Sequence, residues 1–446
     1  MPPLHEPGSV EIGDLLAWLD SHANLEAGGR VRAPSLDRIR PLLDLLGRPQ
    51  ADYPLIHVTG TNGKTSTTRL IAHLLSARGL SVGVYISPHL ERINERMAWG
   101  GEPISDDALA EELRIVCVAE QALLERDGPG ARPTWFEIIT AAGYHWFSDL
   151  GVQVAVAEVG LGGLWDATNA ADAELAVVTN VSIDHVEYLG SSRETIATEK
   201  AGIIKRGATL VLGEPDPGLH GIFLERDPGR VLRTDVDFGV LRNDPAYGGR
   251  AVDLRTPLAE YSDLYLPVHG AHQATNAAIA VTAAETFFGE PFPADFVTEA
   301  LATFRTPGRL EVVGHEPLVI LDGAHNAAGA EALVQAMEEE FPEGPRTLVV
   351  GLMREKDATV MLAALGATEA EWVFTCPPPS PRAMTPNELA EAAFELGVDP
   401  ARVEVQSTVE EAVARALVVT PPEGQIVVAG SLYLVGAARA ALTRAG

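Results

Sequence analysis

The stretch that decides the fold is His57-Val58-Thr59-Gly60-Thr61-Asn62-Gly63-Lys64-Thr65-Ser66. It joins an apolar run at 55–58 to a helix-like segment that we expect over 64–78. In such a turn, backbone N–H groups and the helix N-terminus face a phosphate, and Lys64 adds a positive charge. The usual Walker pattern has a further glycine where this chain has Val58, so the match is to a shorter loop. We predict nucleotide binding by Gly60, Thr61, Asn62, Gly63, Lys64, Thr65 and Ser66.

Composition limits the class of protein to which the chain belongs. Its 446 residues are enough for two or three domains, and 46% hydrophobic residues provide material for packed cores. The 33 Lys and Arg against 62 Asp and Glu give a formal charge of −29, which disfavours nucleic acid and anionic membranes as partners. Two isolated cysteines, Cys117 and Cys376, build neither a disulfide framework nor a cysteine-rich metal site. No leader-like start and no apolar run of about 18 residues are present, so we expect a cytoplasmic protein.

Short apolar runs alternate with longer helix-like stretches along the chain, which predicts an α/β fold with mainly parallel sheets. The expected strands are 55–58, 82–86, 152–156, 176–178, 209–212, 318–321, 347–350, 372–375 and 426–429. Turn chemistry at Pro307-Gly308 precedes a fresh strand–helix series, so we expect domains at 1–306 and 307–446. We also expect a helix over 328–340, a β-rich excursion at 238–267 and a rigid proline-rich loop at 376–386.

Polar side chains follow three of the expected strands. Ser87, Glu158 and His185 come at or shortly after strand ends, which meet at one edge of a parallel sheet. A hydroxyl, a carboxylate and an imidazole at that edge predict a Mg²⁺ site beside the phosphate loop. Taken singly, Glu158 is also explained as a cap or loop carboxylate, and His185 as an ordinary hydrogen-bonded polar residue.

Several longer motifs share one order and spacing with a known family. In that order and spacing, the chain resembles the folylpolyglutamate synthase/dihydrofolate synthase family of the Mur ligase superfamily, from about residue 50 to Ser431-Leu432. The motifs that carry the resemblance, besides the phosphate loop, are Ser87-Pro88-His89-Leu90, Glu91-Arg92-Ile93-Asn94, Glu158-Val159-Gly160-Leu161-Gly162-Gly163, Asp166-Ala167-Thr168-Asn169, Asp184-His185, Leu189-Gly190, Glu199-Lys200-Ala201-Gly202-Ile203, His272-Gln273, Asn276-Ala277-Ala278, Pro307-Gly308-Arg309 and Asp322-Gly323-Ala324-His325-Asn326.

The resemblance implies an N-terminal ATPase domain, a smaller Rossmann-like C-terminal domain, and an active site between them. It implies ATP with one or two Mg²⁺ ions as cofactors, and it leaves a K⁺ requirement open. By motif position, the metal ligands would be Ser87, Glu158, His185 and a hydroxyl such as that of Thr65. Lys200 matches a lysine that is carbamylated in the family, although the residues alone favour a helix lysine paired with Glu199. The implied ATP contacts are Asn276, Arg309 and Asp322, and the implied substrate contacts are Thr134, Trp135, Phe136, Glu137, Trp165, Asp166 and Ala167.

Some positions keep two explanations. Arg309 is either a linker salt bridge or a phosphate contact, and His325 is either a core histidine or a catalytic group beside the transferred phosphoryl. Lys356 and Asp357 either serve the amino-acid substrate or are solvated charges. The family often has Gly-Ser after the loop lysine, whereas Thr65 and Ser66 follow it here, so the Mg²⁺-facing hydroxyl is ambiguous. Leu164 replaces a family arginine.

The implied reaction is ATP-dependent amide formation. Lys64, Lys200 and His325 would act in catalysis, through an acyl phosphate on a folate carboxylate that the amine of L-glutamate displaces. We expect dihydropteroate to be glutamylated too, and the protein to be a monomer. One alternative is a cell-wall Mur ligase, although the roughly 58 residues before the loop are few for a separate UDP-binding domain. The other is a regulatory ATPase without ligase activity.

Overall fold

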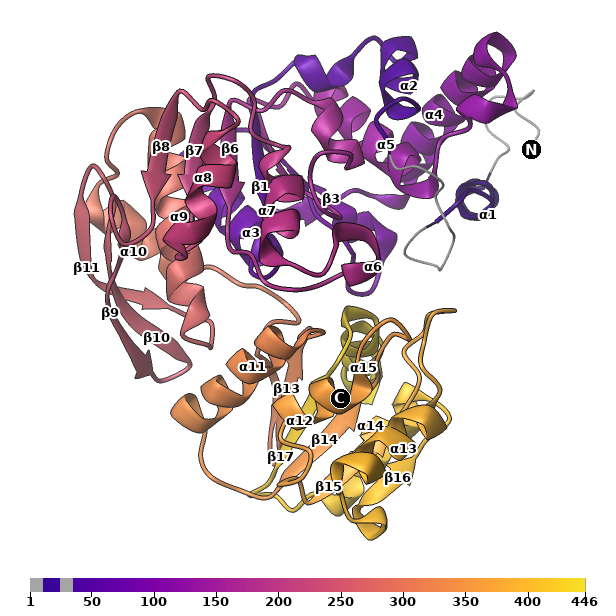
Figure 1. Ribbon diagram of the computed structural model, residues 1–446, viewed down its shortest axis with the longest axis vertical. Coiled ribbons are helices and arrows are strands. Elements are labelled where there is room, and N and C mark those ends of the chain that lie inside the picture. Colours follow the sequence, from indigo (N-terminus) through magenta and orange to yellow (C-terminus); the bar gives the residue numbers. More distant parts are fainter. Residues whose placement is uncertain (1–10, 25–34, 446) are drawn as a thin grey trace.

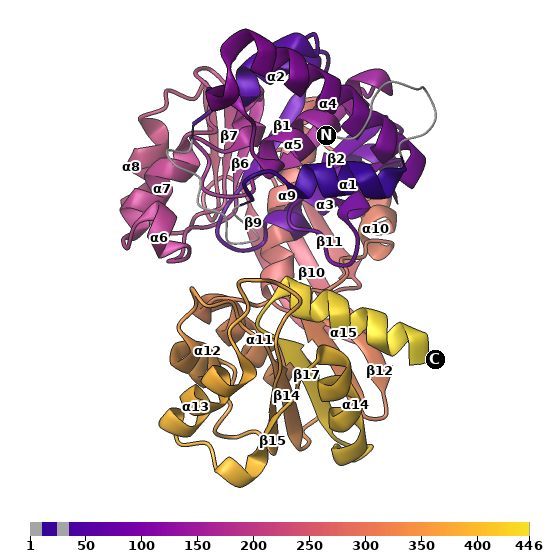
Figure 2. The ribbon, with the colours of Figure 1, turned by 90° about the vertical axis from the view of Figure 1, so that its right-hand side faces the viewer.

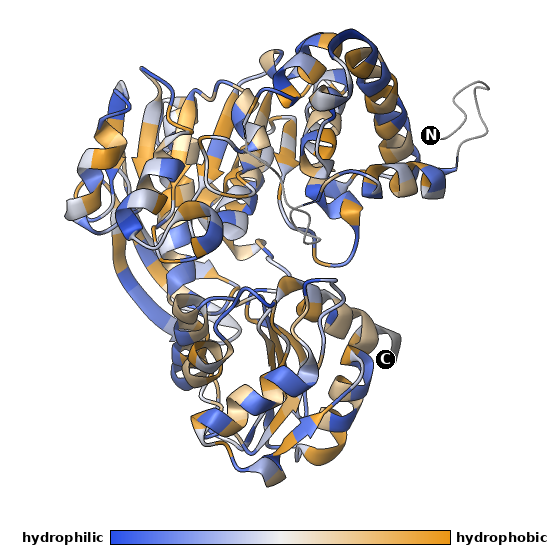
Figure 3. Ribbon diagram, turned by 45° about the vertical axis from the view of Figure 1, so that its right-hand side comes forward, coloured by the Kyte–Doolittle hydropathy of each residue, from blue (hydrophilic) through white to orange (hydrophobic). Residues whose placement is uncertain are grey.

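The computed structural model describes residues 11–24 and 35–445, which form two α/β bodies (Figures 1 and 2). The first body contains every strand from residue 55 to residue 266, and the second contains the strands from 311 to 429. Figure 3 shows hydrophobic residues concentrated along the strands of both bodies. No helix in the described part of the chain combines the length and the apolar character that a bilayer crossing demands.

The main sheet of the first body has eight strands in the order β4-β3-β2-β5-β1-β6-β7-β8. From β2 to β8 all neighbours are parallel, and β3 and β4 extend one edge in antiparallel fashion. The central strands are buried on both faces, which explains why they read as continuous apolar runs. The strands are β1 Leu55–Thr59, β2 Val82–Tyr85, β3 Met97–Trp99, β4 Glu102–Pro103, β5 Val154–Glu158, β6 Leu175–Val178, β7 Thr209–Leu212 and β8 Arg230–Arg233.

Helices cover this sheet because alternate residues of each strand face opposite sides. Ile56 and Val58 of β1 pack with the face that holds α3 (Lys64–Ala77), α9 (His272–Phe288) and α10 (Ala294–Ala302). The opposite face of the sheet, which holds Leu55 of β1, packs against α1 (Ile12–Asp20), α2 (Ile39–Leu45), α4 (Asp106–Asp127) and α5 (Trp135–Asp149). A further cluster joins β6 and β7 to α7 (Arg193–Ala201) and α8 (Pro217–Leu224), and the short α6 (Val186–Leu189) precedes them.

A three-stranded antiparallel sheet, in the order β11-β10-β9, packs against α9 and α10. Its strands are β9 Gly239–Ala246, β10 Gly249–Arg255 and β11 Glu260–Leu266. The β-rich excursion that the sequence predicts at 238–267 is therefore confirmed.

The second body is a six-stranded sheet in the order β12-β13-β17-β14-β15-β16, parallel except for β12. Its strands are β12 Glu311–His315, β13 Leu318–Asp322, β14 Arg346–Val350, β15 Trp372–Thr375, β16 Val403–Val405 and β17 Gln425–Ala429. One face packs on α11 (Ala327–Glu340), α12 (Ala358–Ala364) and α13 (Pro386–Leu396), and the other on α14 (Val409–Val419) and α15 (Leu432–Ala445). Short 3₁₀ turns are η1 Pro49–Ala51, η2 Ile93–Arg96, η3 Pro129–Ala131, η4 Ala167–Ala170 and η5 Pro400–Arg402.

The predicted α/β class with mainly parallel sheets is confirmed, and every expected strand is present within two residues of its expected ends. The largest shift is at β5, which begins at Val154 and ends at Glu158 rather than spanning 152–156. Loops that follow the carboxyl ends of strands in both sheets line one cleft between the bodies. The carboxyl ends of parallel strands are where α/β proteins commonly bind their ligands.

Candidate active site

The phosphate loop connects β1 to α3 and needs glycine at two positions. A Cβ at Gly60 would collide with the hydroxyl of Thr179. Gly63 has φ +79°, and a Cβ there would lie 2.5 Å from Oδ1 of Asn276. Only glycine accepts both the backbone conformation and the close approach, so the loop backbone stays close to its neighbours.

The end of β6 holds the loop in shape. The amide of Asn62 donates to Oδ1 of Asn180 at 3.0 Å, and the Asn62 carbonyl accepts from Thr179 Oγ1 at 2.6 Å and Asn180 Nδ2 at 3.0 Å. The Thr61 hydroxyl donates to the Ser182 carbonyl at 3.0 Å. These bonds fix the loop before any ligand binds.

Two lysines flank the loop in a poorly solvated setting. Lys64 Nζ donates to the Thr61 carbonyl at 3.1 Å, and burial lowers its pKa although the charges of Glu158 and Asp184 oppose this. Lys200, on α7, is buried, and its Nζ donates to the Gly60 carbonyl at 2.7 Å. Burial and then the charge of Lys64 lower the pKa of Lys200 well below its ordinary value, which favours a neutral amine.

Glu158 ends β5 beneath the loop and is 1% exposed. Its Oε1 accepts from the Thr65 hydroxyl at 3.0 Å, and its Oε2 accepts from the Ser87 amide at 3.4 Å. Burial raises the pKa of Glu158, while the charge of Lys64 and the Thr65 hydrogen bond lower it. The Ser87 hydroxyl is buried beside this carboxylate and has no hydrogen-bond partner within residues 11–24 and 35–445. Ser66 lies elsewhere, with Gln273 Nε2 at 3.5 Å from its hydroxyl.

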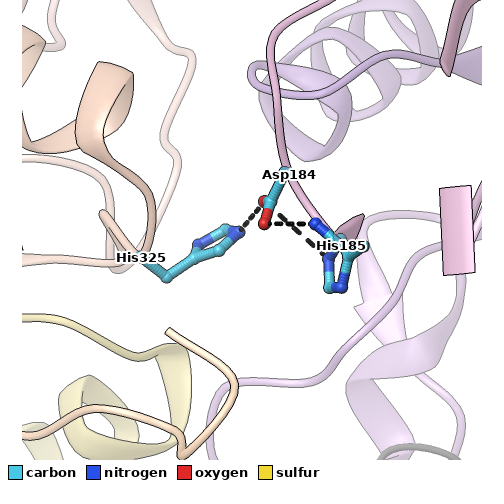
Figure 4. Close-up of side chains that lie close together, drawn as sticks. All are labelled: Asp184, His185 and His325. Atoms are coloured by element: carbon cyan, nitrogen blue, oxygen red, sulfur yellow. Dashed lines mark hydrogen bonds and ion pairs between the residues drawn. The ribbon is translucent and has the colours of Figure 1, made fainter. Parts of the chain in front are cut away.

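Asp184 and His185 meet residues of the second body (Figure 4). Nε2 of His325 lies 3.4 Å from Oδ2 of Asp184, and Nε2 of His185 lies 3.8 Å from the same oxygen. Lys356 pairs with the other oxygen, and Asn326 Nδ2 donates to Oδ2 at 3.0 Å. Donors therefore occupy both oxygens of Asp184, so this trio is a contact between the bodies although its spacing would suit a metal.

Burial and charge set the protonation of this contact. Burial alone would raise the pKa of Asp184, but the hydrogen bond and charge of His325, with His185 and Lys356, lower it far below its ordinary value. Desolvation lowers the pKa of His185 to about 3, against the opposing charge of Asp184. The imidazole of His185 is therefore neutral at pH 7, with a lone pair available to a ligand.

Of the expected ATP contacts, Asn276 lies against the loop, and Arg309 and Asp322 lie close together at the start of the second body. Asn276, on α9, faces Gly63 and donates to Gln273 Oε1 at 3.0 Å. Arg309 runs alongside Gly323, and its guanidinium has neither a hydrogen bond nor an ion pair among the described residues. Asp322 ends β13, and its carboxylate accepts from the amides of Leu310 and Ala324, both at 2.8 Å.

A cleft between the bodies collects most of the expected substrate residues. From the first body it is lined by Ser87, Thr134, Phe136, Glu137, Trp165, Asp166, Ala167, His185 and Tyr188, and from the second by His325, Met353, Glu355, Lys356, Arg382, Ser431 and Tyr433. Trp135 corrects the sequence prediction. Its side chain is 4% exposed in the core, donates to Asp20 Oδ1 at 3.0 Å and packs against Arg96, so it does not reach the cleft.

Comparisons with known proteins decide the family. The Mur ligase middle domain matches residues 58–98 and 143–284, and the Mur ligase glutamate ligase domain matches 308–432. A dihydrofolate synthase/folylpolyglutamate synthase of Mycobacterium tuberculosis is 39% identical over 437 residues, covering 91% of this chain and 89% of the relative. The chain belongs to the dihydrofolate synthase/folylpolyglutamate synthase family.

Solved structures agree with membership of this family. Mycobacterium tuberculosis folylpolyglutamate synthase complexed with ADP superposes with a TM-score of 0.90 at 37% identity, covering 97% of this chain and 98% of that one. Escherichia coli FolC in complex with DHPP and ADP superposes with a TM-score of 0.86 at 28% identity, with both chains fully covered.

Sequence reasoning missed residues beside the phosphate loop and residues of the cleft. Thr179 and Asn180, which clamp the phosphate loop, directly follow β6, so the rule that placed Ser87 and Glu158 at strand ends would have found them. Glu355 and Arg382 gave no motif signal, because they meet only when two loops of the second body pair. Asp357 is resolved as the N-cap of α12, accepting from the Val360 amide.

Proposed function

We propose that this protein is an ATP-dependent ligase that joins L-glutamate to reduced folates and also to 7,8-dihydropteroate. The observation that carries the proposal is the buried Ser87–Glu158 pair beside a glycine-dependent phosphate loop, with Ser87 lining a cleft that also contains the aromatic side chains of Phe136 and Trp165. Membership of a family whose members carry those two activity names supports the substrate class.

The chemistry requires the acceptor carboxylate to be activated. Its oxygen attacks the γ-phosphorus of ATP, the bond to the β-phosphate oxygen breaks, and an acyl phosphate and ADP form. The glutamate amine then adds to the acyl carbon, loses a proton, and expels inorganic phosphate as the amide forms. Both reactants of the first step are anions, so catalysis depends on positive groups that hold them in line.

We propose that the loop amides of residues 60–66 and Lys64 hold the outer phosphates of ATP. The clamp from Thr179 and Asn180 pre-organises these donors. The charge of Arg309 acts on Lys64 and Glu158 beside the loop, and no ion pair of Arg309 is formed among the described residues, which suits it for a phosphate contact. Asn276 lies against Gly63 at the start of α3, and Asp322 fixes the loops around Arg309, so both support the nucleotide pocket.

The residues beside the loop fit a Mg²⁺ ion. The unpartnered, buried hydroxyl of Ser87 lies next to the Glu158 carboxylate, and hydroxyl and carboxylate oxygens are ligands that Mg²⁺ prefers. Thr65 shares Glu158, so its hydroxyl rather than that of Ser66 faces this site. The neutral imidazole of His185, which lines the same cleft as Ser87, would complete the set. When bound, the ion neutralises phosphate charge and aligns the γ-phosphoryl group.

Lys200 supports a further step in this proposal. A buried neutral amine can form a C–N bond to CO₂ and release one proton to solvent, which gives a carbamate with anionic oxygens. Lys200 lines the same small hollow as Lys64 and His185, so the carbamate would complement a second cation there. His325 faces the Asp184 carboxylate with Nε2, which can only donate to it, beside the cleft where the phosphoryl group would transfer.

The acceptor would lie across the cleft. Phe136 and Trp165 provide aromatic faces for a pterin ring, and Glu137 and Asp166 provide acceptors for its N–H groups. Thr134 and Ala167 border the same wall. We propose that the chain works as a monomer with domains at 1–306 and 307–446, because one chain supplies both walls of the cleft. We place it in the cytoplasm, where ATP is available.

Phosphate release tests the proposal with the purified chain, ATP, Mg²⁺, tetrahydrofolate and L-glutamate, each omitted in turn. We expect release only with all four, and amide product by mass spectrometry. Turnover with dihydropteroate as sole acceptor tests the second activity, and KCl against NaCl tests the K⁺ requirement. Release that ignores both folate and glutamate would indicate a regulatory ATPase. Turnover only with a UDP-linked peptide would indicate a cell-wall ligase.

A further inference from the structure

The imidazole of His57, on β1, is fully buried in the first body. Its Nε2 lies 2.8 Å from Oγ1 of Thr168, which belongs to the turn η4. Its Nδ1 has no hydrogen-bond partner in the described part of the chain. Desolvation, with the charge of Lys205, lowers the pKa of His57 to about 3, so the ring is neutral at pH 7. A neutral ring carries one proton, on Nε2 or on Nδ1.

The neighbours of the ring assign this proton to Nε2. Thr168 has a single hydroxyl proton, and its Oγ1 also contacts Oδ1 of Asp166. If the hydroxyl donated to His57, Nδ1 would hold a buried N–H without an acceptor, and Oγ1 would have no proton for the Asp166 carboxylate. With the proton on Nε2, the ring donates to Thr168, and the Thr168 hydroxyl donates to Asp166. We call this series of hydrogen bonds the His57–Thr168–Asp166 relay.

The relay ends on a side chain that lines the cleft. Oδ1 of Asp166 accepts from the amide of Thr168 at 3.0 Å as well as from its hydroxyl, and Oδ2 accepts from the Leu161 amide at 2.9 Å. A Cβ at Gly160 would lie 3.1 Å from Oδ2 and 2.6 Å from Cζ of Phe136. Asp166, Gly160 and Phe136 all line the cleft, so Oδ2 is the Asp166 oxygen beside its aromatic wall.

The backbone of the turn is anchored independently of His57. The hydroxyl of Tyr144, on α5, donates to the Thr168 carbonyl at 2.7 Å, and the Tyr53 hydroxyl donates to the Tyr144 carbonyl at 3.0 Å. These bonds hold η4 against α5 whichever way the Thr168 hydroxyl proton points. The imidazole therefore acts on the direction of that proton, and a change at His57 should alter Asp166 while the turn keeps its place.

We propose that His57 is a positioning residue for the folate acceptor, because it keeps the Thr168 hydroxyl directed at Asp166, which accepts from the pterin ring. The inference rests on the proposed ligase function and adds to it a residue of the strand that leads into the phosphate loop. Burial raises the pKa of Asp166, and the hydrogen bonds from Thr168 oppose this rise, so the relay favours the carboxylate. Linked hydrogen bonds polarise one another, so the bond from His57 strengthens the one from Thr168.

The test is a double-mutant cycle in the phosphate-release assay. His57→Leu should raise KM for tetrahydrofolate and for dihydropteroate at least about fivefold, because the Thr168 hydroxyl is no longer held toward Asp166. KM for ATP should stay within about twofold of wild type, because the relay runs to the cleft wall and not to the phosphate loop. His57→Gln places an amide N–H near the position of Nε2 and should restore most of the loss. Thr168→Val removes the hydroxyl, so adding His57→Leu to it should change the acceptor KM by less than about twofold.

The outcomes separate this inference from the function on which it rests. Leu55→Ala is the matched control, because it removes a buried side chain two residues away on the same face of β1 and should lower the Tm with little change in any KM. Wild-type protein without acceptor-dependent turnover would overturn both the inference and the proposed function. Wild-type turnover with an unchanged acceptor KM in His57→Leu would overturn the inference alone, as would an equal rise in KM for ATP. If His57→Leu does not fold, an unchanged acceptor KM in Thr168→Val would overturn it instead.

Discussion

The environment of the Ser87 hydroxyl indicates a ligand-binding position rather than ordinary packing. A buried hydroxyl without a partner costs about 1–3 kcal/mol, and that of Ser87 differs from others in the interior because Ser87 also contacts Glu158 and lines the cleft, which favours a role in binding. We expect Ser87→Ala to keep or raise the Tm while raising the Mg²⁺ concentration for half-maximal turnover at least about tenfold. A Mg²⁺ titration with a thermal scan measures both. Thr282→Val removes an unpartnered buried hydroxyl on α9 and should leave the Mg²⁺ requirement alone. An unchanged requirement in Ser87→Ala would contradict the metal site.

Lys200 is the residue at which burial determines chemistry. Its lowered pKa favours the neutral amine that CO₂ requires, and its Nζ already contacts the phosphate-loop carbonyl of Gly60. We expect Lys200→Ala to lower kcat by about 100-fold or more. Acetate or formate should restore part of it by placing a carboxylate where the carbamate stood, and ¹³C-bicarbonate should give a carbamate signal in wild type only. Lys205→Ala, which removes a lysine paired with Asp172, should keep most of the activity. Full turnover in Lys200→Ala would refute the prediction.

The glycines at the two ends of α3 separate two effects of a substitution: backbone strain from a positive φ, and collision of an added Cβ with a neighbour. Gly63 precedes the helix with φ +79°, and Gly79 follows it with φ +90°. A Cβ at Gly79 meets nothing within 4 Å, whereas one at Gly63 meets Asn276. Gly79→Ala should therefore cost about 1–2 kcal/mol of unfolding free energy and leave ATP binding unchanged. Gly63→Ala should also weaken ATP binding, at least about tenfold by calorimetry, because the loop must move from the phosphate. Equal ATP affinity in the two variants would argue against that displacement.

The elements were predictable to the extent that local pattern determines them. β7 and β15 match their predicted limits, because apolar runs bounded by turns mark strands buried on both faces. The phosphate loop was predictable because its chemistry lies within ten consecutive residues. Trp135 was placed wrongly because a helix position alone does not tell which face meets the cleft. The Glu355–Arg382 pair depends on a long-range bridge between loops, for which the sequence carries no local signal.

At the scale of the whole molecule, the two bodies are joined at separate places of different character. Beside the cleft, Asp184 meets Lys356 and His325, which are partly exposed. Away from it, Arg250 of β10 pairs with Glu340 of α11, and both side chains are only 2% exposed. The contact at the cleft is thus open to substrates, whereas the Arg250–Glu340 contact is sealed. We infer that the buried Arg250–Glu340 contact fixes the position at which the two bodies join. We infer that the contact of Asp184 with Lys356 and His325 rearranges when a substrate binds in the cleft.

The sealed contact makes a prediction about pH. Burial alone would raise the pKa of Glu340, but hydrogen bonds from His269, the Gly270 amide and Arg250 outweigh it and lower that pKa. A carboxyl group with a lowered folded-state pKa stabilises the protein above its unfolded pKa, about 4.3, and loses that stabilisation as pH falls through the folded value. Glu340→Gln leaves the buried Arg250 with only Glu339, which is 36% exposed and whose Oε2 lies 3.6 Å from NH1. At pH 7 we therefore expect the variant to cost about 3 kcal/mol.

Thermal unfolding from pH 3 to pH 7 checks this prediction. The Tm of Glu340→Gln should lie below that of wild type at pH 7, and the two should converge at low pH, where the wild-type carboxyl is also protonated. Asp227→Asn removes one partner of the exposed Arg206–Asp227 pair and should change the unfolding free energy by less than about 1 kcal/mol at any pH. A Tm difference in Glu340→Gln that stays constant across this pH range would mean that lost packing, not the ionised carboxylate, accounts for the effect.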